Sequence, residues 1–222
     1  MKSIQKNFIY NVLYQILLVI LPLITAPYIS RTLGAKAVGV YSYTYSVAYY
    51  FLLIAMLGIG NHGNRSIAAV RDNREELNKT FSSIYALQVS TFSIAIITYI
   101  VYLFVIVKDN RLIVLLQLLY VTSGLFDIGW LFFGLEQFKL TVTRNTLIKI
   151  STVLLMFIFV HKPSDLWKYT LIMAAGTLLS QAYLWIYVKK YVTFVKCSLR
   201  EIISNVKPVL ILFIPVLAYS IY

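Results

Sequence analysis

Long stretches of this chain carry no charged residue, and short basic clusters separate them. The first such stretch runs from Asn7 to Ser30, between Lys6 and Arg31. A helix crosses the hydrocarbon core of a bilayer in about 20 apolar residues. Only 13% of the 222 residues are charged, whereas a soluble domain carries about 25%. The pattern therefore predicts an all-α, polytopic transmembrane helical bundle.

The uncharged stretches set the number of membrane-spanning helices. We expect six complete helices, at about 8–30, 38–60, 80–107, 112–135, 145–160 and 169–188. Residues 208–222 are apolar again, but 15 residues reach only about 22 Å of a core about 30 Å thick. This last segment is either interfacial or the cut beginning of a seventh helix. Residues 1–207 then form one lobe, and residues 208–222 begin a second.

The basic residues indicate how the bundle lies in the membrane. A net charge of +12 also occurs in nucleic-acid-binding proteins, but here the charges lie between apolar spans. Fourteen of the 20 Lys and Arg residues fall in the segments that share a side with the N-terminus. Cytoplasmic loops carry the excess of Lys and Arg. We therefore expect a cytoplasmic N-terminus and a cytoplasmic loop at 189–207.

The two longer cytoplasmic segments allow two interpretations. Each could hold a short amphipathic helix on the inner membrane surface, or each could be a solvated loop. In the second segment, apolar residues fall near helical spacing among basic ones; they are Phe194, Leu199, Ile202, Ile203 and Val206. Basic amphipathic helices bind anionic lipid, and the sequence does not decide between the two.

Asp127 is the only acidic residue well inside a predicted span. An ionisable group at membrane depth is costly and usually faces a bundle interior or a wet cavity. Helical spacing places it on one broad face of the 112–135 helix with Tyr120, Ser123, Gly124, Trp130 and Gly134. Two interpretations follow, a cavity wall with an anionic centre or a buried pair that serves only packing.

The first predicted helix carries a second polar stripe, which includes Asn11 and Gln15. Pro22 and Pro27 remove backbone donors and can kink the helix. A bent helix with a polar face suits a transporter that opens and closes, so both prolines are candidate hinges. The alternative is that Asn11 and Gln15 only bond neighbouring helices, as polar residues in bundles do.

Two further groups have both a structural and a functional interpretation. Arg31 directly follows the first helix and is either an interfacial anchor or a cation that attracts an anionic substrate. Five tyrosines crowd the start of the second helix, at 41, 43, 45, 49 and 50. An aromatic belt at the membrane interface explains most of them, and sugar stacking is the alternative for one or two.

The sequence contains no pattern for enzyme chemistry. His62 and His161 are isolated and predicted on opposite sides of the membrane, and Cys197 is the only cysteine. There is no metal-ligand spacing, no P-loop and no nucleophile elbow. We expect no enzyme, no metal and no organic cofactor, so any transport would be secondary or would use a partner.

Several motifs, in order, resemble the Wzx-type polysaccharide repeat-unit flippases of the multidrug/oligosaccharidyl-lipid/polysaccharide exporter superfamily. They are the segments 22–34, 39–42, 57–60, 64–68, 127–136, 144–145 and 213–222. No single motif is diagnostic, but their order and spacing cover the whole chain. The resemblance implies a two-lobed fold of 12 to 14 helices around a central cavity, of which this chain is the MATE-like N-terminal lobe.

The resemblance also implies a function in the bacterial cytoplasmic membrane. Such flippases move undecaprenyl-diphosphate-linked oligosaccharide from the inner to the outer leaflet, for capsule, O-antigen or related polysaccharides. Their partners would be polysaccharide polymerase and glycosyltransferase machinery. Arg31 and Arg65 would meet the diphosphate, and Asp127 would couple transport to protons or sodium. The alternatives are a multidrug or ion-coupled exporter of the same superfamily and a non-transporting membrane fragment.

The predicted orientation can be tested with single cysteines in a Cys197→Ser background. We expect a membrane-impermeant thiol reagent, added to intact cells, to label Asn110→Cys and to leave Glu75→Cys unlabelled until the membrane is opened. Labelling of position 75 alone would show that the chain has the opposite orientation.

Overall fold

The fold is entirely helical over the described part of the chain, which is the backbone of residues 2–221 and the side chains of residues 19–218 of a computed structural model. No strand occurs within these residues. The elements are α1 (Lys2–Met56), α2 (Ile59–Val70), α3 (Arg74–Val105), α4 (Arg111–Ser123), η1 (Gly124–Phe126), α5 (Gly129–Gly134), α6 (Phe138–Phe159), η2 (Pro163–Asp165), α7 (Leu166–Tyr183), α8 (Trp185–Tyr191), α9 (Leu199–Ser204) and α10 (Val206–Ile221).

Six helical segments are long and apolar enough to cross a membrane. They are Val19–Val70, Arg74–Val105, Arg111–Gly134, Phe138–Phe159, Pro163–Tyr191 and Leu199–Ala218. The first has 52 residues, or about 78 Å of helix, more than twice the thickness of the core. It contains residues 19–30 of the first predicted helix and the whole of the second, so the six segments overlap all seven predicted ones. The chain is a multi-pass membrane protein, as the apolar runs predict.

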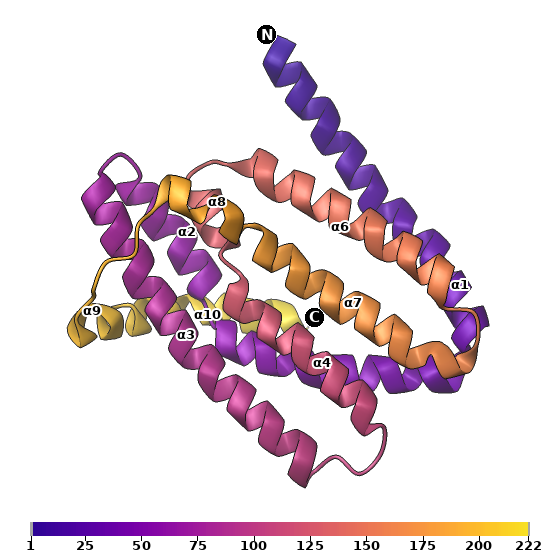
Figure 1. Ribbon diagram of the computed structural model, residues 1–222. Helices are drawn as coiled ribbons and strands as arrows, with labels where there is room; N and C mark the ends of the chain where they lie inside the picture. The colour runs from indigo at the N-terminus through magenta and orange to yellow at the C-terminus, as the bar shows by residue number, and fades with distance from the viewer. Residues whose placement is uncertain (1, 222) are drawn as a thin grey trace.

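Gly34 separates the two legs of α1. Its backbone has φ 75° and ψ 165°, outside the helical region, and glycine is the residue that adopts a positive φ without strain. The sequence predicts a loop of several residues between the two helices at this point. Instead the helix continues to Leu33, reverses direction at one glycine and resumes at Ala35 (Figure 1).

The connections gather at two opposite ends of the bundle (Figure 1). The turn between α2 and α3, the connection from α5 to α6 and the segment before α9 lie at one end. The bend at Gly34, the α3–α4 loop and the turn between α6 and α7 lie at the other. Successive segments therefore cross the bundle in alternating directions, which is the arrangement that the charge pattern assumes.

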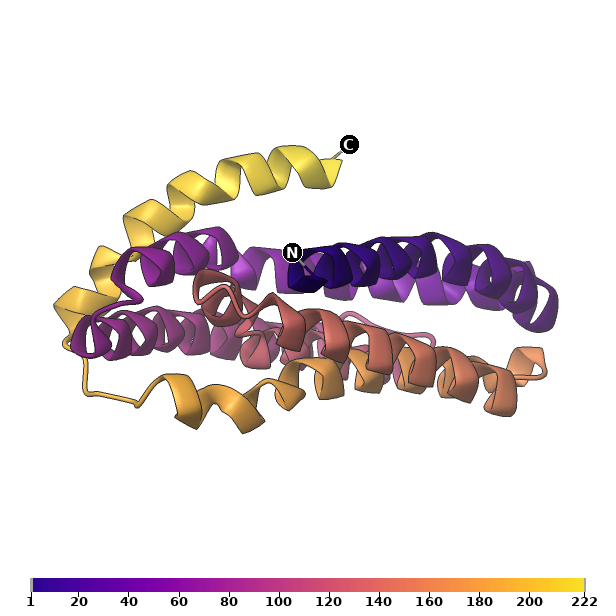
Figure 2. The same cartoon turned by 90° about the horizontal axis from the view of Figure 1, so that it is seen from above.

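The helices form layers that leave one side of α1 and α2 free of the main packing. α1 packs on α3, α4 and α7, and α2 packs on α3 and α5. Figure 2 shows α10 on the opposite side of α1 and α2 from α6 and α7. α10 contacts α2 and α9 and otherwise diverges from the bundle. One face of α1 therefore points toward the side on which α10 lies.

Glycines set the closest helix contacts at the end that holds α2 and α5. A Cβ at Gly63 would lie 2.5 Å from the ring of Trp130, and one at Gly134 would lie 2.7 Å from Ile67. Gly124 meets the ring of Phe92 in the same way. Without side chains, these glycines let large residues of α3 and α5 fill the core, since interiors pack to high density.

Large apolar side chains cover much of the outer surface of the bundle. On α3 and α6 they are Ile94, Ile97, Val101, Phe104, Leu147, Leu154 and Ile158, all exposed. Apolar patches of this extent are rare on soluble monomers. Contact with lipid is therefore the natural environment of these two helices.

Several helix bounds differ from those predicted by hydropathy alone. The 80–107 helix begins at Arg74, because Asn73 caps it by accepting hydrogen bonds from the backbone N–H of Glu75 and Glu76 (3.1 and 3.3 Å). The 145–160 helix begins at Phe138. The 169–188 helix is interrupted at Leu184. Hydropathy marks only where charge is absent, whereas helices extend through polar interfacial turns.

The segment at 189–207 combines three local structures. α8 extends to Tyr191, residues 192–198 are not helical, and α9 occupies Leu199–Ser204. The backbone N–H of Thr193 donates to Asn78 (2.8 Å) and that of Val195 donates to Ser82 (3.1 Å). This segment, 192–205, is a linker bound along α3 that includes the short helix α9, which carries Leu199, Ile202 and Ile203 of the predicted amphipathic helix.

The glycine contacts predict how packing responds to one added methyl group. Gly63→Ala should destabilise the protein by about 1–3 kcal/mol, because overpacking costs that much and the buried Trp130 ring has no space to move. Gly39→Ala is the matched control, since a Cβ there meets nothing within 4 Å. Thermal unfolding in detergent measures both, and equal midpoints for the two variants would contradict the packing.

Candidate functional site

The predicted 112–135 helix is broken in the middle, and this changes the surroundings of Asp127. α4 ends at Ser123, one 3₁₀ turn follows, and α5 begins at Gly129. Asp127 has an extended backbone with φ −75° and ψ 93°. The residues from Tyr120 to Gly134 therefore do not share one continuous helical face, and the predicted stripe is wrong in that respect.

The side chain of Gln88 holds the break together. Its amide nitrogen donates to the carbonyls of Gly124 (2.7 Å) and Asp127 (2.9 Å), and its amide oxygen accepts from the indole N–H of Trp130 (3.0 Å). Gln88 is completely buried on α3. Backbone groups freed inside a membrane need such partners, because lipid supplies none.

Trp185 supplies a further partner from α8. Its indole N–H donates to the carbonyl of Phe126 at 3.0 Å. Side chains of Gln88 and Trp185 thus bind three carbonyls of the 124–127 segment. Neither residue was predicted from the sequence, although an amide in the middle of an uncharged run was a usable signal for Gln88.

Asp127 lies close to a buried cation. Its Oδ1 accepts the backbone N–H of Gly129 (3.0 Å), and the guanidinium of Arg144 on α6 interacts with it electrostatically. Arg144 is only 6% exposed and donates to Gln181 (2.8 Å) on α7 and to Asn145. Arg144 thus connects α6 with α7 through Gln181, and its charge acts on Asp127 just before α5.

Ser123 and Trp130, the other predicted residues of this region, are also inside the lobe. The hydroxyl of Ser123 donates to the carbonyl of Tyr120 (2.6 Å), and Trp130 bonds Gln88. Both side chains are at most 2% exposed. Both side chains therefore contact other parts of the protein, and their hydrogen bonds help to hold the backbone of the break around Asp127 in place.

A different set of residues forms an open polar face. On the second leg of α1, Gly39, Tyr43, Ser46 and Tyr50 follow helical spacing and are all exposed. Tyr43 and Tyr50 are 66% and 54% exposed. Along α2, exposed polar or small residues again follow helical spacing, namely Asn61, Asn64, Arg65 and Ala68. We call these eight residues together with Arg31 the polar face of α1 and α2.

The opposite side of the second leg is fixed by stacked tyrosines. Tyr45 stacks on Tyr41 and on Tyr49, with ring centroids 5.8 and 6.4 Å apart. Tyr45 also contacts Tyr120 of α4, and Tyr41 contacts Tyr169 of α7. These rings pack the helix against the bundle, whereas Tyr43 and Tyr50 stay largely exposed, with Tyr43 beside Tyr102 of α3 and Tyr50 beside Tyr49. The five tyrosines thus divide between packing and surface.

The other predicted residues of α1 and α2 are placed as follows. Arg31 is exposed three residues before the bend, and Arg65 is exposed on α2. Neither forms an ion pair within the part of the chain that the structure describes. Pro22 and Pro27 lie inside the first leg of α1 and are exposed. Asn11 and Gln15 lie outside the residues whose side chains are described.

Polar residues exposed on a membrane helix limit what can lie against it. Lipid cannot hydrogen-bond serine, asparagine or arginine side chains, so such groups face protein or water. The residues of the polar face are exposed, although Tyr43 also interacts with Tyr102 of α3, and α10 lies on the opposite side of α1 and α2 from α6 and α7 (Figure 2). This arrangement can accommodate a hydrated, anionic or hydroxylated molecule beside α1 and α2.

Comparison with known proteins identifies the family. A family model described as "Polysaccharide biosynthesis protein" matches residues 4–222. The chain belongs to this family of polysaccharide biosynthesis proteins, and the match confirms the resemblance carried by the motifs.

Two relatives carry the name "Putative O-antigen transporter". One, from Escherichia coli (strain K12), is 25% identical over 166 residues, which is 74% of this chain and 40% of the relative. The other, from Shigella dysenteriae, is 27% identical over 206 residues, which is 90% of this chain and 51% of the relative. The chain thus spans about half the length of these curated relatives. No solved structure matches it.

The hydrogen bonds at the break predict a large effect for one amide. Gln88→Met keeps the volume of the side chain but leaves the indole of Trp130 and two carbonyls without partners, at about 1–3 kcal/mol for each buried group. We expect a clearly lower thermal midpoint in detergent. Ser90→Ala, which removes an exposed hydroxyl bonded within the same helix, should leave the midpoint unchanged. A Gln88→Met protein as stable as this control would show that water or lipid replaces the amide.

Proposed function

We propose that this chain is one lobe of a flippase for lipid-linked oligosaccharides in the bacterial cytoplasmic membrane. The substrate is the undecaprenyl-diphosphate-linked repeat unit of a capsule, O-antigen or related polysaccharide, and it moves from the inner to the outer leaflet. The polar face of α1 and α2 supports this proposal most directly, because an exposed polar surface occurs on an otherwise apolar bundle.

The physical problem of the reaction is the headgroup of the substrate. Sugars and a diphosphate lose their hydration in hydrocarbon, and this costs several kcal/mol for each polar group left without a partner. A polar face on one side of the lobe replaces that hydration while the lipid tail stays in the bilayer. Ser46, Asn61 and Asn64 supply hydrogen bonds, and Tyr43 and Tyr50 supply exposed rings.

The charge of this face favours an anionic substrate. Residues 1–71 contain no acidic residue, and Asp72 is the first in the chain. The polar face therefore carries Arg31 and Arg65 without a compensating carboxylate. Arginine binds phosphate oxygens with two parallel hydrogen bonds. One arginine lies near the bend at Gly34, and the other lies on α2, beyond the two residues Leu57 and Gly58 that separate α1 from α2, so each meets the diphosphate at a different stage of crossing.

The absence of acidic residues from this face also separates the proposal from its nearest alternative. A multidrug exporter for cationic compounds needs carboxylates where its substrate binds. Asp127 is the carboxylate at membrane depth in the break, and it is held beside Arg144 within the lobe. We propose that Asp127 acts in coupling to protons or sodium and that it does not contact the substrate.

The remaining parts of the proposal concern the whole transporter. Since the chain spans about half of its relatives, a second lobe would close the cavity over the polar face. The N-terminus lies in the cytoplasm, as the basic residues predict, and polymerase and glycosyltransferase machinery are the partners. Pro22 and Pro27 act as hinges in the first leg of α1.

The two arginines provide the test. In the full-length transporter, Arg31→Ala or Arg65→Ala should lower the surface display of polysaccharide by about tenfold or more, because each removes a charged hydrogen-bond donor worth about 1.5–3 kcal/mol. Asp127→Asn should lower it as well. Lectin or antibody labelling of intact cells measures display, normalised to the amount of transporter in the membrane.

Lys108→Ala is the matched control, since it removes an exposed cation from the end of the bundle that carries the Gly34 bend but not from the polar face. Its display should equal that of the unchanged protein. Full display with both arginine variants would overturn the assignment of the polar face.

A further inference from the structure

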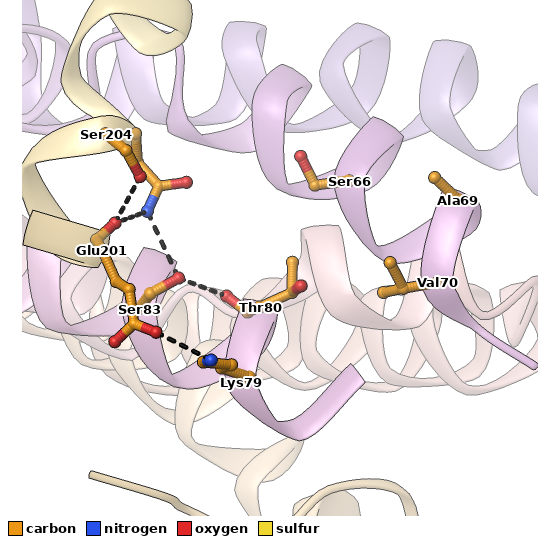
Figure 3. A pocket seen from close by; sticks show the side chains of 9 residues that line it. Ser66, Ala69, Val70, Lys79, Thr80, Ser83, Glu201 and Ser204 are labelled. Carbon is orange, nitrogen blue, oxygen red and sulfur yellow. Dashed lines mark hydrogen bonds and ion pairs between the residues drawn. The ribbon is translucent and has the colours of Figure 1, made fainter. Parts of the chain in front are cut away.

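An open pocket of about 420 Å³ lies between α2, α3 and α9 (Figure 3). It sits at the end of the bundle that carries most of the basic residues. Its lining is rich in hydroxyl groups and consists of Ser66, Ala69, Val70, Lys79, Thr80, Ser83, Glu201, Ser204 and Asn205. Ligand sites have volumes of about 300–1,000 Å³, so the pocket is large enough for a small ligand.

The wall that α9 contributes is held in place by polar contacts. Lys79 forms an ion pair with Glu201 at 2.9 Å. The amide nitrogen of Asn205 donates to Ser83 (3.2 Å), and its amide oxygen lies 2.8 Å from a ring nitrogen of His62 (Figure 3 shows the first of these contacts). The pocket is therefore built across three elements, and its shape depends on the docking of α9.

The lining favours a neutral ligand with several hydroxyl groups. Glu201 neutralises Lys79, so no unpaired charge attracts an anion into the pocket. The Thr80 hydroxyl has no hydrogen-bond partner among the described residues, and that of Ser66 has only a 3.5 Å contact with His62. These two groups are available to a ligand. Hydroxyl, amide and carboxylate groups together donate to and accept from the hydroxyls of a sugar.

The position of the pocket connects it to the route of the substrate. The turn between α2 and α3, with Arg71 and Arg74, lies at the same end as the pocket (Figure 1). Under the predicted orientation this end faces the cytoplasm, where a lipid-linked oligosaccharide begins its crossing. A sugar bound here would lie at the level of the inner leaflet's headgroups, before it reaches the polar face.

We propose that the pocket between α2, α3 and α9 binds a sugar unit of the lipid-linked oligosaccharide before transport. The proposal rests on the proposed function and adds a second, cytoplasmic binding site for the same substrate. A lipid headgroup could also reach the pocket, so the test separates recognition of the sugar from recognition of the lipid phosphate.

The test measures protection of single cysteines in the full chain, reconstituted in nanodiscs in a Cys197→Ser background. Cys197 is the only cysteine in the sequence, so the Cys197→Ser change leaves the introduced cysteine as the only thiol. Ser66→Cys reports on the pocket, Ser46→Cys on the polar face, and Asp72→Cys on an exposed position outside both. A small charged methanethiosulfonate is the reagent.

The ligand is the lipid-linked saccharide fraction extracted from cells that carry the gene, compared with the same fraction after mild acid has released its sugars and washing has removed them. We expect the intact fraction to slow labelling of Ser66→Cys severalfold and to leave Asp72→Cys unchanged, whereas the hydrolysed fraction has no effect at Ser66→Cys. Equal protection by both fractions would overturn the proposal, because the pocket would then recognise lipid or phosphate.

The polar face provides the outcome that separates the two proposals. Protection of Ser46→Cys without protection of Ser66→Cys would overturn the pocket and leave the proposed function standing. Protection at neither position would count against both.

A second variant tests the pocket without disturbing the contacts of α9. Thr80→Val removes one unpartnered hydroxyl and preserves the shape of the side chain. The ligand concentration that half-protects Ser66→Cys should rise about five- to tenfold, as expected for one hydrogen bond of about 1–1.5 kcal/mol. Thr98→Val on the same helix, where the hydroxyl bonds Ile94, should cause no change. Equal shifts for the two variants would contradict a direct contact with Thr80.

Discussion

Hydrocarbon offers no hydrogen bonds, so a membrane helix can be interrupted only where other parts of the protein bind the freed backbone groups. The break between α4 and α5 meets this condition through the amide of Gln88 and the indole of Trp185. With the carbonyls of 124–127 satisfied, α5 can change direction toward α2. That change brings Trp130 over Gly63 and Gly134 against Ile67. The packing of one whole end of the bundle therefore depends on two side chains that come from α3 and α8.

The number and type of helices were predictable because hydropathy is a local property of the sequence. Uncharged runs mark the spans, and basic clusters mark their ends. The reversal at Gly34 was not predictable to the residue, since several positions between 31 and 37 could have formed the turn. The break at 124–129 was not predictable either. The sequence around Asp127 is apolar and compatible with a helix. The interruption is stable in hydrocarbon because Gln88, which is distant in the sequence, binds the freed carbonyls.

The candidate site shows the same division between local and distant information. Arg31 and Arg65 were identified from their positions next to spans, and the structure leaves both exposed. Ser123 and Trp130 were grouped with Asp127 on the assumption of an unbroken helix, and they instead lie within the lobe.

The sequence showed a crowd of tyrosines on the second leg of α1. It could not show that Tyr41, Tyr45 and Tyr49 face the bundle, because that requires knowing where α4 and α7 pack. Arg144 served only as one of the basic residues that predict the orientation in the membrane, whereas its side chain is buried and its charge acts on Asp127.

The contact between α10 and Gly58 has a mechanical consequence. A Cβ at this position would overlap the backbone of α10 at Val209, Leu212 and Phe213, so the two main chains touch there without an intervening side chain. Main chains that touch in this way can rotate against each other more easily than helices whose side chains interlock. On the N-terminal side of the contact, α10 is held by the linker at 192–205, which is bound to α3. On the C-terminal side, Ile214 and Leu217 are exposed, so this end of α10 is the least constrained part of the helix.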